Sequence, residues 1–392
     1  MNIIDLVLGV LLLGAAIRGW RQGALSQVFA FGGAAVGLVL GGMVAPSVAA
    51  QFVDRPGVAL SLATFAILIA AILAGQALGF YLGYRLRTAA ESKGVGVADS
   101  LAGIVVGLST LVVTLWIAAS VLANGPSAPI ARVIQGSTIL AQIDDTLPPP
   151  PDIFGRVASF LDTQGFPQVF AGLGGSTAPP VDPPAGELVG AAAAAGTPAT
   201  VQIEARGCGG VSAGSGVAVQ PGFIVTNAHV VAGTGQVSVR DAGGTHDAIA
   251  IHVDPALDLA VISSPTATAT PLPWATVPAD RGTSGASLGF PGGSRDLNVL
   301  PAAVRGREEA IGRDIYGGSL TTREVLTLEA PVRPGDSGGP FVNAAGEIAG
   351  IVFAASTTDP GVGFALTAER VRPDVDAAIA RNAPASTGAC RF

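Results

Sequence analysis

Four long apolar stretches occupy the first 122 residues of the chain. They run from Ile3 to Ile17, from Ala24 to Ala50, from Val58 to Leu82 and from Val97 to Leu122. The last three contain the roughly 20 residues that cross a bilayer, and the first is short but usable. A removable signal peptide has basic residues before a single apolar run, whereas Arg18 and Arg21 follow the first of four runs. The pattern predicts a four-helix transmembrane domain over residues 1–123.

Basic residues are concentrated in every second loop between these stretches. The loops after the first and third stretches contain Arg18, Arg21, Arg85, Arg87 and Lys93. The loop between the second and third has only Arg55, and no basic residue follows the fourth before Arg132. Because basic loops stay in the cytoplasm, we expect the N-terminus and everything after Leu122 to lie outside.

Glycines recur at four-residue spacing within the apolar stretches. They are Gly33, Gly37, Gly41, Gly75, Gly79, Gly83, Gly103 and Gly107. Small residues at this spacing let helix backbones approach closely in lipid, so they predict a packed helix bundle. Asp5 and Asp99 open the first and fourth stretches, where an acid complements the helix dipole and Asp99 or Ser100 caps the helix. A proton path through the two acids is the alternative interpretation.

Residues 124–196 form a linker rich in proline, glycine and alanine. Its segments "LPPPPD" and "APPVDPPAG" are predicted to be extended and stiff. Helical apolar spacing over residues 131–143 and 153–162 predicts two short helices between the proline-rich parts.

From about Val201 the apolar residues fall into short runs separated by turns. The runs include "GVAVQPGFIVTNAHVV", "QVSVRDAGGTHDAIAIHV", "LDLAVI", "ASLGF", "EVLTLEA", "EIAGIVF" and "GVGFAL". Short strands at this spacing predict an all-β barrel or sandwich, and "AERVRPDVDAAIAR" predicts a C-terminal helix.

Composition supports this division of the chain. With 392 residues we expect two or more domains, and 49% hydrophobic against 12% charged residues favours a membrane protein. The net charge of -7 argues against a nucleic-acid partner, and we expect no cofactor and no metal. Cys208 and Cys390 fit one disulfide in an oxidising compartment, with two unrelated buried thiols as the alternative.

The segment "RPGDSGGPF" places Ser337 between glycines and an acid. A serine hydroxyl is a weak nucleophile and needs an adjacent base. Of the three histidines, His229 in "TNAHVV" ends a strand, where a turn can present it. His246 and His252 follow ordinary hairpin alternation and are expected to face solvent.

A histidine base needs a carboxylate that fixes its tautomer and stabilises the imidazolium. Asp258 precedes the apolar strand "LAVI" directly and is the candidate, whereas Asp254 precedes Pro255 and is expected to be a turn residue. The glycines fit the same chemistry, because backbone N–H groups must converge on the developing oxyanion. We expect Gly335 and Ser337 to supply those amides.

The order His229, Asp258, Ser337 is that of chymotrypsin. Residues 197–392 resemble a chymotrypsin-type serine protease, which implies two six-stranded barrels with the site between them. The resemblance implies that His229 is the base, Asp258 the orienting acid and Ser337 the nucleophile. A membrane scaffold or transporter-like protein with a non-cleaving, peptide-binding outer domain is the alternative.

Residues 1–125 resemble the colicin V production protein family through Asp5, "RGWRQG" and "DSLAGIVVG". The two halves together resemble the MarP-type membrane-anchored serine proteases of mycobacteria. This resemblance implies a multi-pass inner-membrane protein whose periplasmic protease domain acts on cell-envelope proteins under acid or oxidative stress. It also implies a Cys208–Cys390 disulfide and self-cleavage in the linker.

Two features depart from related proteases. Stress proteases of the HtrA group usually carry PDZ domains after the protease, and none is expected here. In activated digestive proteases the residue matching Asp336 pairs with a new N-terminus, and no activation site is evident. The pocket stretches fall at residues 330–334 and 352–355, with Pro331 where trypsin has an acid. We therefore expect an apolar or small side chain at the cleavage site.

Overall fold

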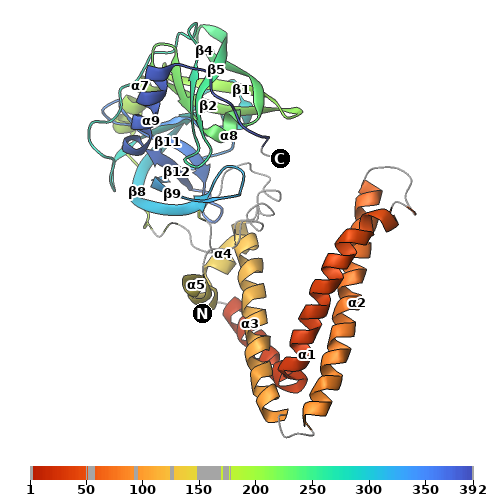
Figure 1. Ribbon diagram of the computed structural model, residues 1–392. Helices are drawn as coiled ribbons and strands as arrows, with labels where there is room; N and C mark the ends of the chain where they lie inside the picture. The colour runs from red at the N-terminus through yellow and green to blue at the C-terminus, as the bar shows by residue number, and fades with distance from the viewer. Residues whose placement is uncertain are drawn as a thin grey trace. The chain divides into compact units, whose positions relative to one another are not determined.

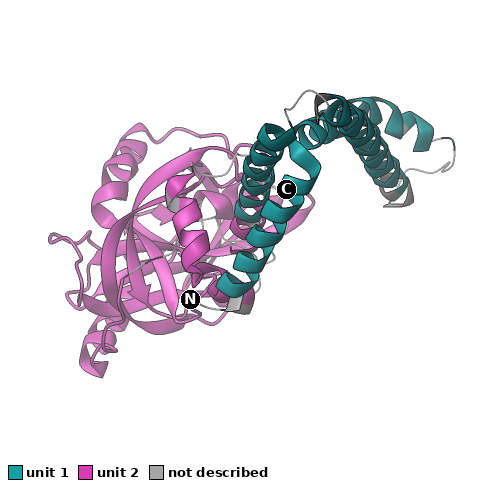
Figure 2. Cartoon of the chain, turned by 90° about the horizontal axis from the view of Figure 1, so that it is seen from below, with its two compact units in different colours: residues 1–116 teal, residues 117–392 magenta. Residues whose placement is uncertain are grey.

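The computed structural model describes residues 3–49, 51, 58–91, 96–123, 128–147, 169–170, 176 and 178–390. The chain divides into two compact units, residues 1–116 and 117–392 (Figure 2). The helix predicted over residues 153–162 lies outside the described residues.

Three long apolar helices begin in the first unit (Figure 1). They are α1 (Ile3–Ala49), α2 (Val58–Glu91) and α3 (Gly96–Ala123). The predicted apolar helices are confirmed, but the described residues contain three helices long and apolar enough to cross a membrane rather than four. The first two predicted stretches both lie within α1. Gly23 between them has a non-helical backbone (φ 73°, ψ 163°), which breaks α1 into two helical segments.

Side chains from the other helices satisfy the backbone at this break. The Leu25 N–H donates to Asp99 Oδ1 at 2.9 Å, so Asp99 caps the second segment of α1. Arg87 donates to the carbonyl of Arg21 and pairs with Asp99 at 3.4 Å. The ion pair therefore joins both broken helix ends at Gly23.

The glycines form the seams between these helices, as predicted. A Cβ on Gly33 would overlap the carbonyl oxygen of Gly75, and a Cβ on Gly75 would overlap that of Gly33. Gly19 and Gly103 are related in the same way where α1 meets α3. Such close backbone approach is the packing that small residues provide in lipid.

The second unit begins with two short helices, α4 (Ala128–Gln135) and α5 (Thr138–Thr146). They cover the segment predicted as one helix, residues 131–143. The chain is interrupted at Ser137, whose hydroxyl accepts from the Leu140 N–H at 3.2 Å and caps α5.

Twelve antiparallel strands in the described part of the second unit form two closed barrels (Figure 1). The first barrel contains β1 (Thr200–Gly207), β2 (Gly210–Gln220), β3 (Phe223–Thr226), β4 (Thr234–Asp241), β5 (Gly244–Asp254) and β6 (Leu259–Ser263). The second contains β7 (Ser284–Gly289), β8 (Asn298–Arg313), β9 (Leu320–Glu329), β10 (Pro340–Asn343), β11 (Ile348–Ala355) and β12 (Val362–Thr367). The strand order is β1-β2-β3-β6-β5-β4 in one and β10-β11-β12-β9-β8-β7 in the other. The predicted chymotrypsin-like β-barrel fold is confirmed.

Turn residues place the predicted hairpins. Gly222 (φ 74°) lies in the turn between β2 and β3, and Gly244 (φ 127°) begins β5 after the predicted turn. The predicted C-terminal helix is α9 (Ala368–Arg381). The described part of this unit also contains the helical segments α7 (Gly186–Gly196), the single turn α8 (Ala228–Val231) and the 3₁₀ turn η1 (Pro291–Gly293).

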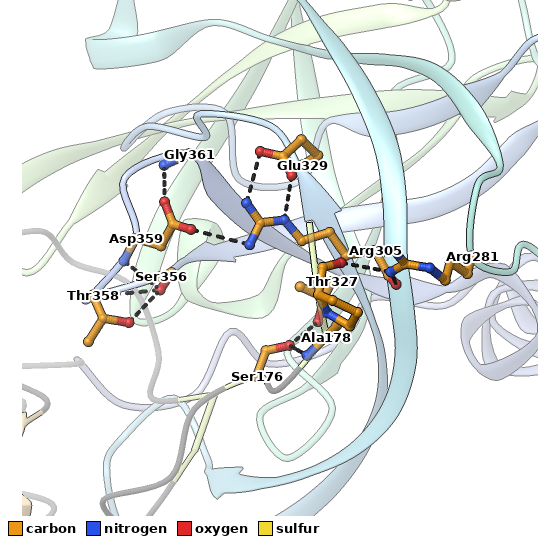
Figure 3. A network of polar contacts seen from close by, with 11 residues as sticks. Ser176, Ala178, Arg281, Arg305, Thr327, Glu329, Ser356, Thr358, Asp359 and Gly361 are labelled. Carbon is orange, nitrogen blue, oxygen red and sulfur yellow. Dashed lines mark hydrogen bonds and ion pairs between the residues drawn. The ribbon is translucent and has the colours of Figure 1, made fainter. Parts of the chain in front are cut away.

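The end of the proline-rich linker lies on the second barrel (Figure 3). Arg281 donates to the carbonyls of Pro179 at 2.7 Å and Pro180 at 2.9 Å. Ser176 hydrogen-bonds to Thr327 at 3.0 Å. This part of the linker is therefore attached to the protease fold rather than solvated on all sides.

The C-terminal tail leaves α9, which contacts strands of both barrels, and continues along the first barrel. Gly233 N–H donates to the carbonyl of Thr387 at 2.9 Å, and the Ala385 N–H donates to that of Ala250 at 2.8 Å. A disulfide joins Cys208 to Cys390 across 182 residues of sequence. It fastens the tail beside the residues that follow α8.

Removal of this disulfide should destabilise the second unit. The chain-entropy estimate for a loop of this size is about 5 kcal/mol, an upper figure. We expect Cys390→Ser to lower the free energy of unfolding by several kcal/mol in urea denaturation, whereas Ser386→Ala in the same tail should leave it nearly unchanged. Equal stability of Cys390→Ser and the unaltered chain would contradict the constraint assigned to the tail.

Candidate active site

His229 lies on the single helical turn that follows β3, so the end of a strand presents it, as predicted. Its Nδ1 is 2.7 Å from Asp258 Oδ2, and its backbone N–H donates to Asp258 Oδ1 at 2.9 Å. The carboxylate therefore holds both the ring and the backbone of His229. The side chain of the histidine is 8% exposed, which leaves one edge of the ring accessible.

Asp258 is fully buried directly before β6. It adopts a left-handed backbone conformation (φ 65°), which is uncommon outside glycine and costs about 1 kcal/mol or more. The Asn227 side chain donates to its carbonyl at 2.9 Å. Asp254, the alternative acid, instead accepts from the N–H groups of Ala256 and Leu257 and shapes the turn.

The first part of the "RPGDSGGPF" segment is a tight turn. The Asp336 N–H donates to the carbonyl of Arg333 at 3.0 Å, and Gly335 between them has φ 100°. Proline at the second position and a glycine with positive φ at the third characterise a type II turn. The Pro334 carbonyl accepts from the Gly292 N–H at 2.7 Å, so the N–H end of the Pro334–Gly335 peptide points away from Gly292.

Ser337 is the second residue of the next turn. The Gly339 N–H donates to the carbonyl of Asp336 at 3.0 Å, and Gly338 has φ 86°. A Cβ on Gly338 would overlap the carbonyl oxygen of Ser215 and the hydroxyl of Thr226. The glycines after the serine thus permit tight packing behind it, as predicted.

Two amides around the serine are unengaged. Within the described chain neither the Gly335 nor the Ser337 N–H donates a hydrogen bond, whereas the amides of Asp336, Gly338 and Gly339 all do. The Gly335 and Ser337 N–H groups are therefore both available to donate to an anionic oxygen. These two donors are the ones expected from the sequence.

The two barrels meet at the serine. The Ser215 N–H on β2 donates to the Ser337 carbonyl at 2.8 Å. A Cβ on the neighbouring Gly214 would lie 2.6 Å from Val230 and 3.2 Å from the Ser337 carbonyl oxygen. Ser337 and the turn that carries His229 therefore both border Gly214. In the described structure no hydrogen bond joins the Ser337 hydroxyl to the His229 ring, and such bonds often tighten only when substrate binds.

Ser215 is a site residue that the sequence reasoning missed. Its hydroxyl donates to the Gly335 carbonyl at 2.7 Å and accepts from the Phe290 N–H at 2.8 Å. It therefore holds both turns of the serine segment from the opposite barrel. The small residues Gly214-Ser215-Gly216 before β3 are the only signal for it in the sequence.

His246 and His252 differ from the prediction that they face solvent. Both are half-buried, and His246 Nε2 lies 2.9 Å from Asp241 Oδ1. The His246 ring contacts Thr266 and Asp241, whereas His252 Nε2 is buried without a hydrogen bond to any described residue. Neither histidine hydrogen-bonds to Ser337 in the structure. Within the described part of the chain no three His, Cys, Asp or Glu side chains are placed to hold a metal ion.

Asp336 is 1% exposed, and no ion pair to its carboxylate is found among the described residues. Its Oδ2 accepts from the Arg333 N–H at 2.9 Å, and its Oδ1 has no hydrogen bond. A Cβ on Gly289 would lie 2.6 Å from that Oδ1. Burial raises the pKa of Asp336 to about 6, against the effects of the Arg333 amide and charge. A backbone amide thus takes the place where digestive proteases have an ammonium group.

The pocket stretch beside the serine is apolar. Val332 is buried, and a Cβ on Gly363 would lie 3.0 Å from Val332 Cβ. Pro331 is exposed. Glycine at position 363 leaves room for the Val332 side chain.

Two family descriptions match the chain: "Trypsin-like peptidase domain" over residues 214–351 and "Colicin V production protein" over residues 4–148. The serine protease Rv3671c of Mycobacterium tuberculosis is 34% identical over 382 residues, which cover 96% of this chain and 95% of that protein. The crystal structure of the Rv3671c protease in its active form is 36% identical with a TM-score of 0.53, and the match covers 56% of this chain and 97% of that one. Mitochondrial serine protease HTRA2 of Bos taurus is 34% identical over 170 residues, 41% of this chain and 35% of that protein.

The raised pKa of Asp336 predicts a pH-dependent stability. An acid whose pKa is raised on folding binds its proton more tightly in the folded state, so stability falls as the pH rises from about 4 towards about 6. Between pH 5 and pH 7.5 this group should remove about 1.4 kcal/mol from the free energy of unfolding. Urea denaturation at the two pH values should show this loss in the unaltered chain and its absence in Asp336→Asn.

The exposed Asp296→Asn variant provides a control for this prediction and should keep the pH dependence of the unaltered chain. An identical pH dependence in Asp336→Asn and Asp296→Asn would show that Asp336 does not titrate in this range.

Proposed function

We propose that this chain, which belongs to the family of serine proteases represented by Rv3671c, cleaves peptide bonds with His229, Asp258 and Ser337 as its catalytic triad. The match over 96% of the chain supports the membership, which the sequence motifs predicted. The chain is accordingly a serine endopeptidase with an N-terminal domain of the colicin V production type.

In this proposal the Ser337 hydroxyl attacks the carbonyl carbon of the scissile peptide. His229 accepts the hydroxyl proton at Nε2 and later gives it to the leaving amine. Asp258 holds the Nδ1–H tautomer and stabilises the imidazolium. The amides of Gly335 and Ser337 donate to the oxyanion, and water then releases the acyl group by the same steps in reverse order.

One observation carries the proposal above all others. A buried carboxylate binds the histidine at 2.7 Å, and the turn that carries this histidine borders the same glycine, Gly214, as a serine flanked by two unengaged amides. Nucleophile, base, orienting acid and oxyanion donors are the four parts of acyl transfer. Packing alone does not require two amides without hydrogen bonds. It also does not require a left-handed backbone at Asp258 or a glycine with positive φ at position 335.

We infer that residues 1–123 cross the membrane four times and that residues 124–196 link them to the protease. A continuous helix of 47 residues is about 70 Å long, roughly twice the hydrocarbon thickness of a bilayer. The break at Gly23 divides α1 into two segments of membrane-spanning size. Four crossings place the N-terminus and the protease on the same face, and the distribution of basic residues makes this the outer face.

The disulfide supports an extracytoplasmic location, because such bonds persist in oxidising compartments. We propose an inner-membrane protease whose substrates are proteins or peptides of the cell envelope, with a role under acid or oxidative stress. Self-cleavage in the linker belongs to the same proposal. The apolar wall at Val332 favours substrates with an apolar or small side chain before the cleaved bond.

The proposed nucleophile predicts a specific covalent label. The full chain in detergent should react with a fluorophosphonate probe, and Ser337→Ala should lose the label completely because the attacking oxygen is gone. In-gel fluorescence with equal protein loading measures the difference. Ser319→Ala removes an exposed hydroxyl elsewhere on the second barrel and should label as the unaltered chain does.

Label that persists in Ser337→Ala, or no label on the folded unaltered chain, would contradict the proposal. Either result would favour a membrane scaffold whose outer domain binds peptides without cutting them.

A further inference from the structure

A fully buried arginine lies where the acid of the proposed triad meets the second barrel. Arg323 on β9 is 1% exposed. Its Nε donates to the carbonyl of Ala256 at 2.9 Å, and its Nη2 donates to that of Arg313 at 2.7 Å. Its Nη1 is buried without a hydrogen bond to any described residue. Burial of a guanidinium is costly unless it is paired, so this position calls for an explanation.

The Ala256 carbonyl belongs to the loop that presents Asp258. This loop connects β5 to β6 on the first barrel, whereas Arg323 comes from the second. The same loop receives a hydrogen bond from the Ile315 N–H to the carbonyl of Pro255 at 3.1 Å. The second barrel thus holds the acid loop at two successive carbonyls, two and three residues before the left-handed Asp258.

The other side of the guanidinium faces the strand behind the nucleophile. The Arg323 guanidinium carbon lies 5.8 Å from the centre of the fully buried Phe353 ring, within the range of a cation–π contact. Phe353 follows Val352, whose carbonyl accepts from the Gly338 N–H at 2.8 Å. Arg323 therefore lies between the acid loop and the strand that supports the serine turn.

The charges around the guanidinium are mostly negative. Burial lowers the pKa of Arg323 from its usual value, and the negative charges of Asp258, Asp314 and Asp254 oppose this, Asp258 most strongly. Among the described residues Asp258 pairs with His229 on α8, and the charges of Asp258, Asp314 and Asp254 act on Arg323 on β9. A nearby positive charge favours the ionised carboxylate and disfavours a second positive charge on His229.

We propose that Arg323 is a positioning residue of the active site, which clamps the Asp258 loop to the second barrel and places its positive charge near the Asp258 carboxylate. The inference rests on the proposed function. Loss of the Arg323 charge makes the Asp258 carboxylate and the His229 imidazole easier to protonate. Activity is then lost at a higher pH when the solution is acidified. A residue that acted by packing alone would lower activity by the same factor at every pH.

The test is the rate of fluorophosphonate labelling of the full chain in detergent, measured between pH 4.5 and pH 8. The probe reports nucleophile activation without a known substrate. The acid limb is the part of the pH profile where the labelling rate rises to its plateau. In Arg323→Gln we expect the pH at the midpoint of this limb to rise by about half a unit or more, and the plateau rate to be about tenfold lower. Arg323→Lys keeps the charge but not the planar fork, so its limb should stay within about 0.2 pH units of the unaltered chain, with an intermediate plateau.

Arg307→Gln is the matched control, because Arg307 also lies on the second barrel and pairs with Glu324 at 2.7 Å, but it makes no contact with the acid loop among the described residues. Its acid limb should not move. A folded Arg323→Gln whose limb coincides with that of the unaltered chain would overturn the inference. So would an Arg323→Lys limb displaced by half a unit. If Arg323→Gln does not fold, the uncharged variant Arg323→Met takes its place, with the same expected shift and the same contradicting result. Absence of labelling in the unaltered chain would instead refute the proposed function, which keeps the two failures distinct.

Discussion

The two β-barrels must keep one orientation, because His229 and Asp258 belong to the first and Ser337 to the second. Ser215 is the most direct connection: its amide and hydroxyl bind the carbonyls of Ser337 and Gly335. Each such hydrogen bond contributes only about 1 kcal/mol, so the geometry depends on several together. The tail disulfide acts on a larger scale, since it ties the segment that follows the second barrel and α9 back to the first barrel.

Buried polar groups lie near the contact between the two barrels, where they hold the backbone in a fixed conformation. Asp336 holds the turn before the nucleophile through one amide and leaves one oxygen without a partner. Asp258 adopts a left-handed conformation that the surrounding hydrogen bonds maintain. Departures of this kind cost stability and collect at functional sites. The membrane unit has a parallel, because the Arg87–Asp99 pair is buried at the break in α1.

Local chemistry made much of the fold readable in the sequence. Hairpins at Gly222 and Gly244 followed from turn residues. The expected contact of His229 with Asp258 is present, and the catalytic roles of these two residues and of Ser337 stay a prediction. Contacts between distant segments were not readable. Ser215 and Arg323 have ordinary neighbours in the sequence, and their roles arise only when the barrels meet. Strand β8 was missed because Pro301 and Gly306 interrupt its pattern and its charged side chains pair with β9. The break at Gly23 was expected as a loop between two helices, but side-chain capping keeps the chain helical on both sides of it.

The central claim is that one rigid arrangement brings an activated serine and two amide donors to the same carbonyl. A crystal structure of the protein reacted with a peptide boronate tests it most directly. The account predicts a bond from Ser337 Oγ to boron, one boronate oxygen within hydrogen-bonding distance of the Gly335 and Ser337 amides, and His229 Nε2 beside the adduct. A boronate bound to another residue, or a Gly335 amide turned away from the adduct, would contradict it.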